Sequence, residues 1–566
     1  MKKGNTNILI QSALTIILII LVNLIAHRFY TYVDLTEDKR FTLEDATKKL
    51  VSDVDQTIFV EVLLEGQLNS GFIRLQNRCR EVLDQLNNLN QNIEYSFTNT
   101  SEGTVEEINQ RREKLRQEGI FPTTVFIFED DQRVEKLIYP YAIINYGDRR
   151  IAVNLLEPLA RGENEEEAVN RSAMLLEYKL ASTISKLIAK KAPIIAFTEG
   201  HGELEANQTA MLETILGRTM NTLRIQLDSV YIINDEVDIL IIAGPEEQLN
   251  ERSQFIIDQY IMNGGNVIWL IEQFYINLDS INNNKVYVPR PVDHGLDDMF
   301  FKYGIRINRD VVLDLENTKI PQVYGMSGDR AQQQLFPWVF HPLLQGNQES
   351  SLVRNIDRVA SYFPSTIEVL DSPESRNSTV LLTSSQYSRY QVYPSINISF
   401  ETLRLPQKPE AYNKSYLPVA VMIEGTFNSY FKNRVSQVMM DGLRQINMDF
   451  KESSTSSKQA FIGDADIIKN LYDPATNRIS PIGFNKWEGY TYEGNEDFII
   501  NTIDYMLDDY GLIEARSKSF KLRLLDQVRL KKEKLKWQAF NIALPVALVI
   551  ILGLLFTYWR RRKYTD

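Results

Sequence analysis

The sequence predicts an α/β protein bracketed by two transmembrane helices. Apolar stretches of membrane-spanning length lie near both ends of the chain, and between them β-branched runs alternate with amphipathic helical patterns. The chain has 566 residues, of which 44% are hydrophobic, so it is long enough for several packed domains. We therefore expect two α/β domains between the membrane helices.

The first apolar stretch, residues 8–26, contains the polar residues Gln11, Ser12, Thr15 and Asn23. Its length is close to the ~20 residues that a helix needs to cross a bilayer. A cleaved signal peptide is the alternative, but the HRFYTYVDLT that follows lacks the small-x-small pattern of a cleavage site. We predict an uncleaved transmembrane helix.

Residues 30–158 form the first predicted α/β module. The β-branched run TIFVEVLL is typical of a central strand, and further strands are expected at IEYSF, TTVFIF, KLIYPYAII and RRIAVNLL. A first helix carries a stripe of apolar residues at Phe72, Leu75, Cys79, Val82, Leu83 and Leu86. With a second helix ending at Gly119, the order β-α-β-α-β-β predicts a thioredoxin-like fold.

Cys79 is the only cysteine, so the chain cannot form an intramolecular disulfide or the Cys-x-x-Cys of a redox enzyme. Its place on the apolar stripe predicts a core thiol without redox chemistry.

A linker helix is predicted over residues 159–192. Acidic residues lie at its start and lysines at its end, which is the order that a helix dipole favours, and Pro193 follows it.

Residues 193–514 form the second predicted domain. Strands at IIAFTE, LRIQL, DILIIAG and NVIWLIE alternate with helices, and this alternation predicts a parallel, doubly wound sheet. The pattern loosens over about 275–416, where strand-like runs occur only at DVVLD and STVLLTSS, so an irregular insertion is expected there. Order returns with the strands LPVAVMIEG and QAFIGDADII and the helix EDFIINTIDYMLDD.

The chain ends with a basic juxtamembrane helix, residues 515–539, and a second transmembrane helix, residues 540–559. Pro545 is tolerated in a membrane helix, and Tyr558 and Trp559 lie where an aromatic belt is expected.

Basic residues lie between each span and the nearby chain terminus, at Lys2 and Lys3 and at Arg560 to Lys563. They predict that both termini are cytoplasmic. The basic stretch RLKKEKLKW argues against this topology, although it can rest on anionic headgroups. We expect an inner-membrane protein with a periplasmic ectodomain of roughly 510 residues. The net charge of −12 and the lack of basic-aromatic runs argue against nucleic-acid binding.

Several stretches together resemble the gliding-motility auxiliary component of an ABC transporter, the GldG family of Bacteroidetes-type bacteria. They are DLTEDKRFTL, GHGE, YIMNGGNVIWLIE, LPVAVMIEG, FIGDADII and NEDFIINTIDYML. The resemblance runs over nearly the full length in the same order. It implies a substrate-binding-like subunit that works beside a separate ATPase and permease, and a central domain of glutamine-amidotransferase-like fold.

The turn after the strand IIAFTE offers Glu199, His201 and Glu203 as candidate ligand or partner contacts. Three interpretations stay open: a structural turn whose glycines allow positive φ, a contact residue set, and a catalytic or metal site. We predict no metal, because the chain has four histidines and none of the other three is near His201 in sequence.

Glu272 and Trp338 are two further candidate contacts. Amidotransferases of the implied fold use a cysteine at a strand-to-helix elbow, whereas NVIWLIE leads to Glu272 with no Cys, Ser or Thr at the turn. Trp338, in FPWVFHPLL, either packs in a core or stacks on a sugar or partner. We therefore predict no catalytic residue.

The sequence thus predicts a non-enzymatic subunit without a cofactor. The chain has no G-x-x-x-x-G-K-[ST] loop, so the ATPase of the transporter must be a separate subunit. Its expected partners are an ABC ATPase, a permease and membrane lipid, with cell-wall glycan or an unknown solute as candidate ligands. The alternatives are an envelope hydrolase or amidotransferase-like enzyme and a glycan-binding scaffold.

Overall fold

The computed structural model describes residues 14, 15, 17, 18, 21, 42–129, 132–159, 162–277, 281, 287–327, 330–370, 376–400, 403, 407–445, 449–516 and 527–564. The chain divides into two units, Met1–Lys518 and Ser519–Asp566, and each is treated by itself. Most of the predicted first span, residues 8–26, lies outside the described residues. The predicted α/β class is confirmed by the helices and sheets of the first unit.

The N-terminal part of the first unit is built on a four-stranded sheet with the order β2-β1-β5-β6. β1 is parallel to β2 and antiparallel to β5, and it is the central strand that the sequence predicted. A separate hairpin joins β3 and β4. The elements are α2 (Asp45–Ser52), β1 (Ile58–Val62), α3 (Ser70–Leu89), β2 (Ile93–Phe97), α4 (Val105–Gln117), β3 (Thr123–Glu129), β4 (Gln132–Ile138), β5 (Tyr141–Tyr146) and β6 (Arg149–Asn154).

The helix that follows β1, α3, buries the six apolar residues that the sequence predicted, Cys79 among them. Burial raises the pKa of the Cys79 thiol to about 12, so the thiol stays protonated at neutral pH. This is the environment of an unreactive core cysteine.

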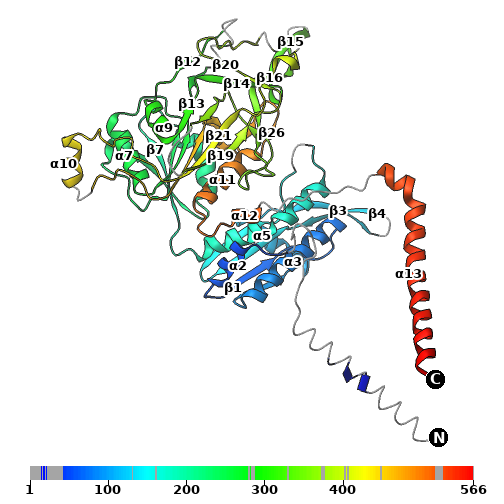
Figure 1. Cartoon of the computed structure of the whole chain (residues 1–566). Coiled ribbons are helices and arrows are strands. Elements are labelled where there is room, and N and C mark those ends of the chain that lie inside the picture. The colour runs from blue at the N-terminus through cyan, green and yellow to red at the C-terminus, as the bar shows by residue number, and fades with distance from the viewer. Residues whose placement is uncertain are drawn as a thin grey trace. The chain divides into compact units, whose positions relative to one another are not determined.

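The segment predicted as a linker, residues 159–192, contains the helix α5 (Glu165–Ile188). Its side chains Val169, Leu176 and Ile184 belong to the same hydrophobic cluster as α3 and the sheet. α3 and α5 run side by side over that sheet (Figure 1). α5 is therefore part of the N-terminal core, because its apolar stripe is buried against α3 and the sheet.

The second part of the first unit contains a larger sheet with the order β15-β16-β19-β21-β22-β10-β9-β7-β8. Only β22, β10, β9, β7 and β8 form the parallel arrangement that the sequence predicted. β15, β16, β19 and β21 pair antiparallel, so the sheet is mixed. Antiparallel neighbours need no crossover helix, and the sequence alternation of strands and helices therefore did not reveal them.

The elements around the parallel strands are β7 (Ile194–Glu199), α6 (Ala206–Leu216), β8 (Asn221–Gln226), β9 (Ile239–Ala243), α7 (Glu251–Met262), β10 (Asn266–Leu270), β21 (Pro418–Gly425), α10 (Gln437–Gln445), β22 (Ser457–Ile462), β23 (Tyr472–Asp473), β24 (Arg478–Ile479), β25 (Phe484–Asn485), β26 (Tyr490–Thr491), α11 (Gly494–Met506) and α12 (Ile513–Arg516). Alternate strand residues enter two hydrophobic clusters. One cluster contains α6 and α11, and the other contains α7 and α9 (Asp297–Tyr303). Both faces of the parallel strands are thus covered, which explains their nearly continuous apolar sequence.

The stretch 275–416, predicted to be irregular, contains much more regular structure than expected. The predicted runs DVVLD and STVLLTSS correspond to β14 and β19. The elements are β11 (Phe274–Tyr275), β12 (Arg290–Pro291), α9 (Asp297–Tyr303), β13 (Ile305–Ile307), β14 (Asp310–Asp314), β15 (Asn317–Ser327), β16 (Arg330–Gly346), β17 (Val359–Ala360), β18 (Ile367–Val369), β19 (Arg376–Thr383) and β20 (Ser388–Val392). The first part of β16 is exposed and rich in glutamine, so its sequence lacks the apolar run of a buried strand.

The second unit contains the helix α13 (Gln527–Tyr564). The part of the predicted basic helix from residue 527 to 539 and the predicted span, residues 540–559, join within it. Residues 515 and 516 belong to α12, and residues 517–526 lie outside the described part. Among the described residues, the Phe540–Arg560 part of α13 is the one helical stretch that is long and apolar enough to cross a membrane.

Candidate functional site

A pocket of about 370 Å³ opens at the carboxyl ends of β7, β9, β10 and β22. Its wall is formed by the residues that follow each strand, such as Glu203 after β7, Gly244 after β9, Glu272 after β10 and Asp466 after β22. In open α/β sheets this edge is where ligands bind, because the loops there diverge and leave a crevice. The position of the GHGE turn at this edge follows from its sequence, and the other three loops meet it in the fold.

Two glycines let other segments pack closely against these loops. Gly202 has φ +78°, and a Cβ atom there would lie 3.1 Å from the Cβ of Glu246 in the next loop. A Cβ atom on Gly463, which follows β22, would lie 2.3 Å from the carbonyl oxygen of Ser365. Glycine is required at both positions, the first for its backbone conformation and the second for space.

His201 holds the turn together from inside. Its backbone carbonyl accepts hydrogen bonds from the amides of Glu246 and Glu247 at 3.0 and 2.9 Å, and its own amide donates to Glu203 at 2.7 Å. The ring is buried, with Nε2 at 3.4 Å from the hydroxyl of Ser253 on α7. His201 is not among the residues that line the pocket. Its contacts support the structural-turn interpretation.

The two glutamates of the turn have different surroundings. Glu199 accepts a hydrogen bond from Arg224 at 2.9 Å and does not line the pocket. Glu203 lines the pocket, and its side chain is 2% exposed. Within the described part of the chain, Oε1 of Glu203 has no hydrogen-bond partner.

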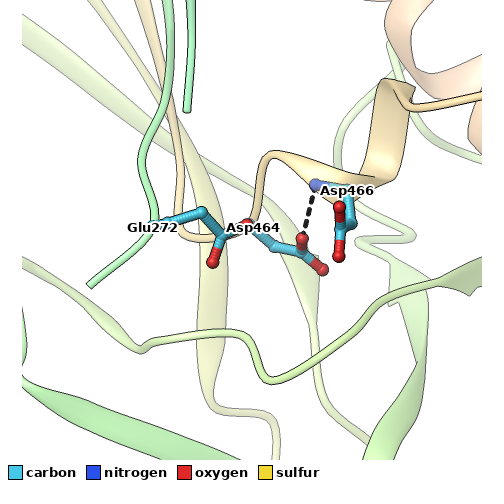
Figure 2. Close-up of side chains that lie close together, drawn as sticks. All are labelled: Glu272, Asp464 and Asp466. Carbon is cyan, nitrogen blue, oxygen red and sulfur yellow. Dashed lines mark hydrogen bonds between the residues drawn. The ribbon is translucent and has the colours of Figure 1, made fainter. Parts of the chain in front are cut away.

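Glu272 meets two acidic residues from the loop after β22. Carboxylate oxygens of Glu272, Asp464 and Asp466 lie within 4.8 Å of one another (Figure 2). Glu272 accepts from the amide of Ala465 at 2.7 Å. Asp464 accepts from the amide of Asp466 at 2.8 Å, the bond drawn in Figure 2. We name Glu272, Asp464 and Asp466 the acidic cluster.

The carboxyl groups of the acidic cluster would repel one another if all were ionised, because they are close together and partly or fully buried. Burial and then the Asp464 and Asp466 charges hold the pKa of Glu272 well above its ordinary value. Burial and then the Asp466 charge raise the pKa of Asp464 to about 7. Lys469 provides a nearby cation, with Nζ at 2.8 Å from Oδ1 of Asp466, and the Asp466 charge raises its pKa in turn.

Part of the pocket lining is aromatic. Trp487 lies parallel to the ring of His341, with centroids 6.1 Å apart and planes 14° apart. His341 is 1% exposed, and both of its ring nitrogens lack a hydrogen-bond partner among the described residues. Burial lowers the pKa of His341 to about 3, so the ring is neutral. The other aromatic lining residues are Phe274, Tyr275, Tyr362, Phe363 and Phe484.

Trp338, the remaining sequence candidate, does not line the pocket. It is fully buried on β16 in a hydrophobic cluster that also contains the lining residues Phe274 and Phe363, and its ring centroid lies 4.5 Å from that of His341 and 5.1 Å from that of Phe400. Of the two interpretations of this residue, the packing one agrees with these contacts.

The structure therefore brings Glu203 and Glu272 to one pocket and leaves Glu199, His201 and Trp338 outside its lining. Asp464, Asp466, Lys469 and His341 were not identified as site residues from the sequence. A signal for the two aspartates existed: FIGDADII places them directly after a buried strand. If that strand had been recognised as the parallel neighbour of β10, its acidic end would have been expected beside Glu272.

Comparisons with known proteins place most of this region in one family model. Residues 192–502 match the model described as ABC-type uncharacterized transport system, and residues 37–145 match a domain of unknown function, DUF7088. An uncharacterized protein from Borreliella burgdorferi is 24% identical over 471 residues, which cover 81% of this chain and 85% of that protein.

Two solved structures share weaker likenesses with the chain. The mmIFT52 N-terminal domain is 13% identical with a TM-score of 0.30, and the match covers 56% of this chain and 97% of that one. A catalytic mutant of Gan42B, a GH42 beta-galactosidase from G. stearothermophilus, is 8% identical with a TM-score of 0.21, over 62% of this chain and 35% of that one. Neither likeness carries an argument about activity.

Proposed function

The chain belongs to the family described as ABC-type uncharacterized transport system, and from this premise we propose that it is a non-catalytic, membrane-anchored auxiliary subunit of an ABC transporter. The observation that carries the proposal is the family match over residues 192–502, which contain the whole pocket. The sequence has no phosphate-binding loop of the G-x-x-x-x-G-K-[ST] type, so the ATPase is a separate subunit. A permease is the second partner, because the two spans proposed for this chain are too few to form a translocation path across the membrane.

The proposal includes two anchors, at residues 8–26 and 540–559, with both termini cytoplasmic and the α/β unit in the periplasm. The apolar Phe540–Arg560 part of α13 supports the second anchor, and the basic residues beyond each span support the orientation. The first anchor rests on the sequence alone.

The finer fold assignments are part of the same proposal. A thioredoxin-like N-terminal module is supported by the order β2-β1-β5-β6, in which one parallel pair is continued by antiparallel strands. A glutamine-amidotransferase-like second domain is supported by the parallel strands covered on both faces. A role in gliding motility rests on the resemblance of the sequence stretches to that family, and its test is the surface spreading of a deletion strain.

The test of the complex is replacement of residues 8–26 by an unrelated apolar helix of equal length. Membrane helices associate through close packing and polar contacts, and this stretch offers Gln11, Ser12, Thr15 and Asn23. We expect the variant to remain folded and exported but to lose the ATPase and permease that co-purify with the wild type in mild detergent.

The matched control is the same unrelated helix with those four polar residues restored at their positions, which should recover the complex. Purification of the wild type without any ATPase or permease would contradict the proposal. Full co-purification of the first replacement would remove the role assigned to the first span.

A second candidate, an envelope hydrolase, is favoured by one observation. The acidic cluster lies in a pocket with aromatic walls, and its members differ in environment: the pKa of Glu272 is raised, while Asp466 is paired with Lys469. Such differences separate a general acid from an ionised carboxylate. The test is incubation of the purified chain with cell-wall fragments, in which soluble products that disappear in Glu272→Gln would replace the non-catalytic proposal.

A further inference from the structure

The acidic cluster gathers three carboxyl groups around one ion pair. Carboxylate oxygens of the three residues lie within 4.8 Å of one another, and Lys469 forms an ion pair with one of them, Asp466, at 2.8 Å. Asp464 is completely buried, and Glu272 and Asp466 are partly buried. Ionised groups taken out of water are costly unless an opposite charge accompanies them, so the cluster requires either protons or an additional cation.

The three carboxylates are held in place by the protein itself. The amide of Ala465 binds Glu272, the amides of Tyr362 and Asp466 bind Asp464, and the ammonium group of Lys469 binds Asp466. Ser361 also donates its hydroxyl to Asp464. A site whose ligands are fixed by backbone donors needs little rearrangement when a ligand arrives.

A second observation, separate from the cluster, points to a ligand in the same pocket. Glu203 and His341 both line it, and their side chains are almost completely buried. Both ring nitrogens of His341 have no hydrogen-bond partner in the part of the chain that the structure describes, whereas Oε1 of Glu203 lies 3.8 Å from Nδ1 of His201. Buried polar atoms without partners are rare in proteins and point to a ligand, ion or water that contacts them.

We propose that the acidic cluster binds one hard divalent cation, Mg²⁺ or Ca²⁺, with the remaining coordination positions facing the pocket. Oxygen donors select hard cations, and a cluster of three carboxylates lacks the histidine or cysteine nitrogen and sulfur atoms that Zn²⁺ prefers. The pocket leaves room for waters or for ligand oxygens on the open side. The inference goes beyond the transporter proposal, because it concerns the isolated chain.

The test uses the purified full-length chain in detergent after treatment with a chelator. Mn²⁺, which is detected by electron paramagnetic resonance, serves as the probe. We expect one Mn²⁺ per chain, displaced by Mg²⁺ or by Ca²⁺, and the more effective competitor identifies the preferred ion. Glu272→Gln and Asp466→Asn should each weaken Mn²⁺ binding at least tenfold, since each removes one charged ligand at nearly constant shape.

A matched control separates the cluster from the general charge of the region. Glu246→Gln removes an exposed carboxylate from the same pocket wall. This variant should bind Mn²⁺ within twofold of the wild type. A loss in Glu246→Gln equal to that in Glu272→Gln would mean that Mn²⁺ follows the overall charge of the pocket, which would overturn the proposal.

A measurement on the wild type keeps the inference testable if the cluster variants do not fold. Addition of Ca²⁺ or Mg²⁺ should slow amide hydrogen exchange in residues 463–469 and leave exchange in α3 unchanged. Absence of stoichiometric Mn²⁺, or unchanged exchange in residues 463–469 at saturating concentrations of both ions, would refute the cation site and indicate that protons balance the cluster. Neither result depends on whether an ATPase or permease co-purifies.

Discussion

Replacement of Trp338 by alanine is the change that best separates a packing role from a binding role for this residue. Trp338 is fully buried and contacts Phe340, Phe363 and Phe400 at centroid distances of 5.8, 5.4 and 5.1 Å. A buried tryptophan removes ~150–250 Å² from water, which corresponds to about 4–6 kcal/mol at ~25 cal/mol per Å². Core substitutions of this kind cost about 3–5 kcal/mol in practice, and we expect about 4 kcal/mol.

The control variant is Trp338→Phe. The indole Nε1 has no hydrogen-bond partner among the described residues, so its removal breaks no hydrogen bond that the structure shows. The phenyl ring fills part of the space, and we expect a loss of about 1–2 kcal/mol.

The assay is native-state hydrogen exchange of β14 and β16, followed by mass spectrometry on the full-length protein in detergent. It reports the local free energy of opening, which suits a chain with several cores. A contact residue for a sugar or partner would behave differently: alanine would weaken binding and leave exchange in β16 unchanged. A loss of less than about 1 kcal/mol would refute the packing role, since truncation of a fully buried tryptophan cannot cost so little.

Three other predictions concern stability and topology. Asp258 is fully buried and accepts hydrogen bonds from Tyr303 Oη at 2.9 Å and from Ser429 Oγ and the Tyr430 amide at 2.7 Å. Asp258→Ala should therefore lower the free energy of unfolding, measured in urea, by about 3 kcal/mol or more, and Asp258→Asn should lower it less. Burial and then neighbouring carboxylates raise the pKa of Glu493 from 4.5 to about 7, so its ionisation destabilises the folded state as pH rises from 4.5 through 7. Glu493→Gln should therefore gain stability over the wild type between pH 5 and pH 8, and the two proteins should converge below pH 4.5; a constant difference across that range would contradict the shift. Alkaline phosphatase fused to either chain end should be inactive, and activity at one end would refute the topology with two cytoplasmic termini.

Part of the pocket could be predicted from local sequence. The GHGE turn follows an apolar strand, so its place at the carboxyl edge of the sheet is expected from the strand alone. Glu272 follows another such strand for the same reason. The sequence could not show which glutamate faces the pocket, because Glu203 and Glu199 differ in their partners in space, and Arg224, the partner of Glu199, lies on β8.

The acidic cluster could not be predicted from local sequence. In the sequence, the antiparallel strands β15, β16, β19 and β21 all lie between Glu272 and Asp464. Only the pairing of β10 with β22 brings the two residues together in space. His341 likewise reaches the pocket from β16, within a stretch for which the sequence predicted irregular structure.

By itself, the sequence determined the α/β class, the central strand β1, the buried stripe of α3, the strands and helices of the parallel half, and the apolar C-terminal helix. Each of these features is encoded locally, in a hydrophobic period or in the length of an apolar run. The tertiary structure alone decided the antiparallel strands of 275–416, the membership of α5 in the N-terminal core, and the convergence of the acidic cluster. These features depend on pairings between segments far apart in the chain, and a local pattern carries no information about which distant strand or helix will cover it.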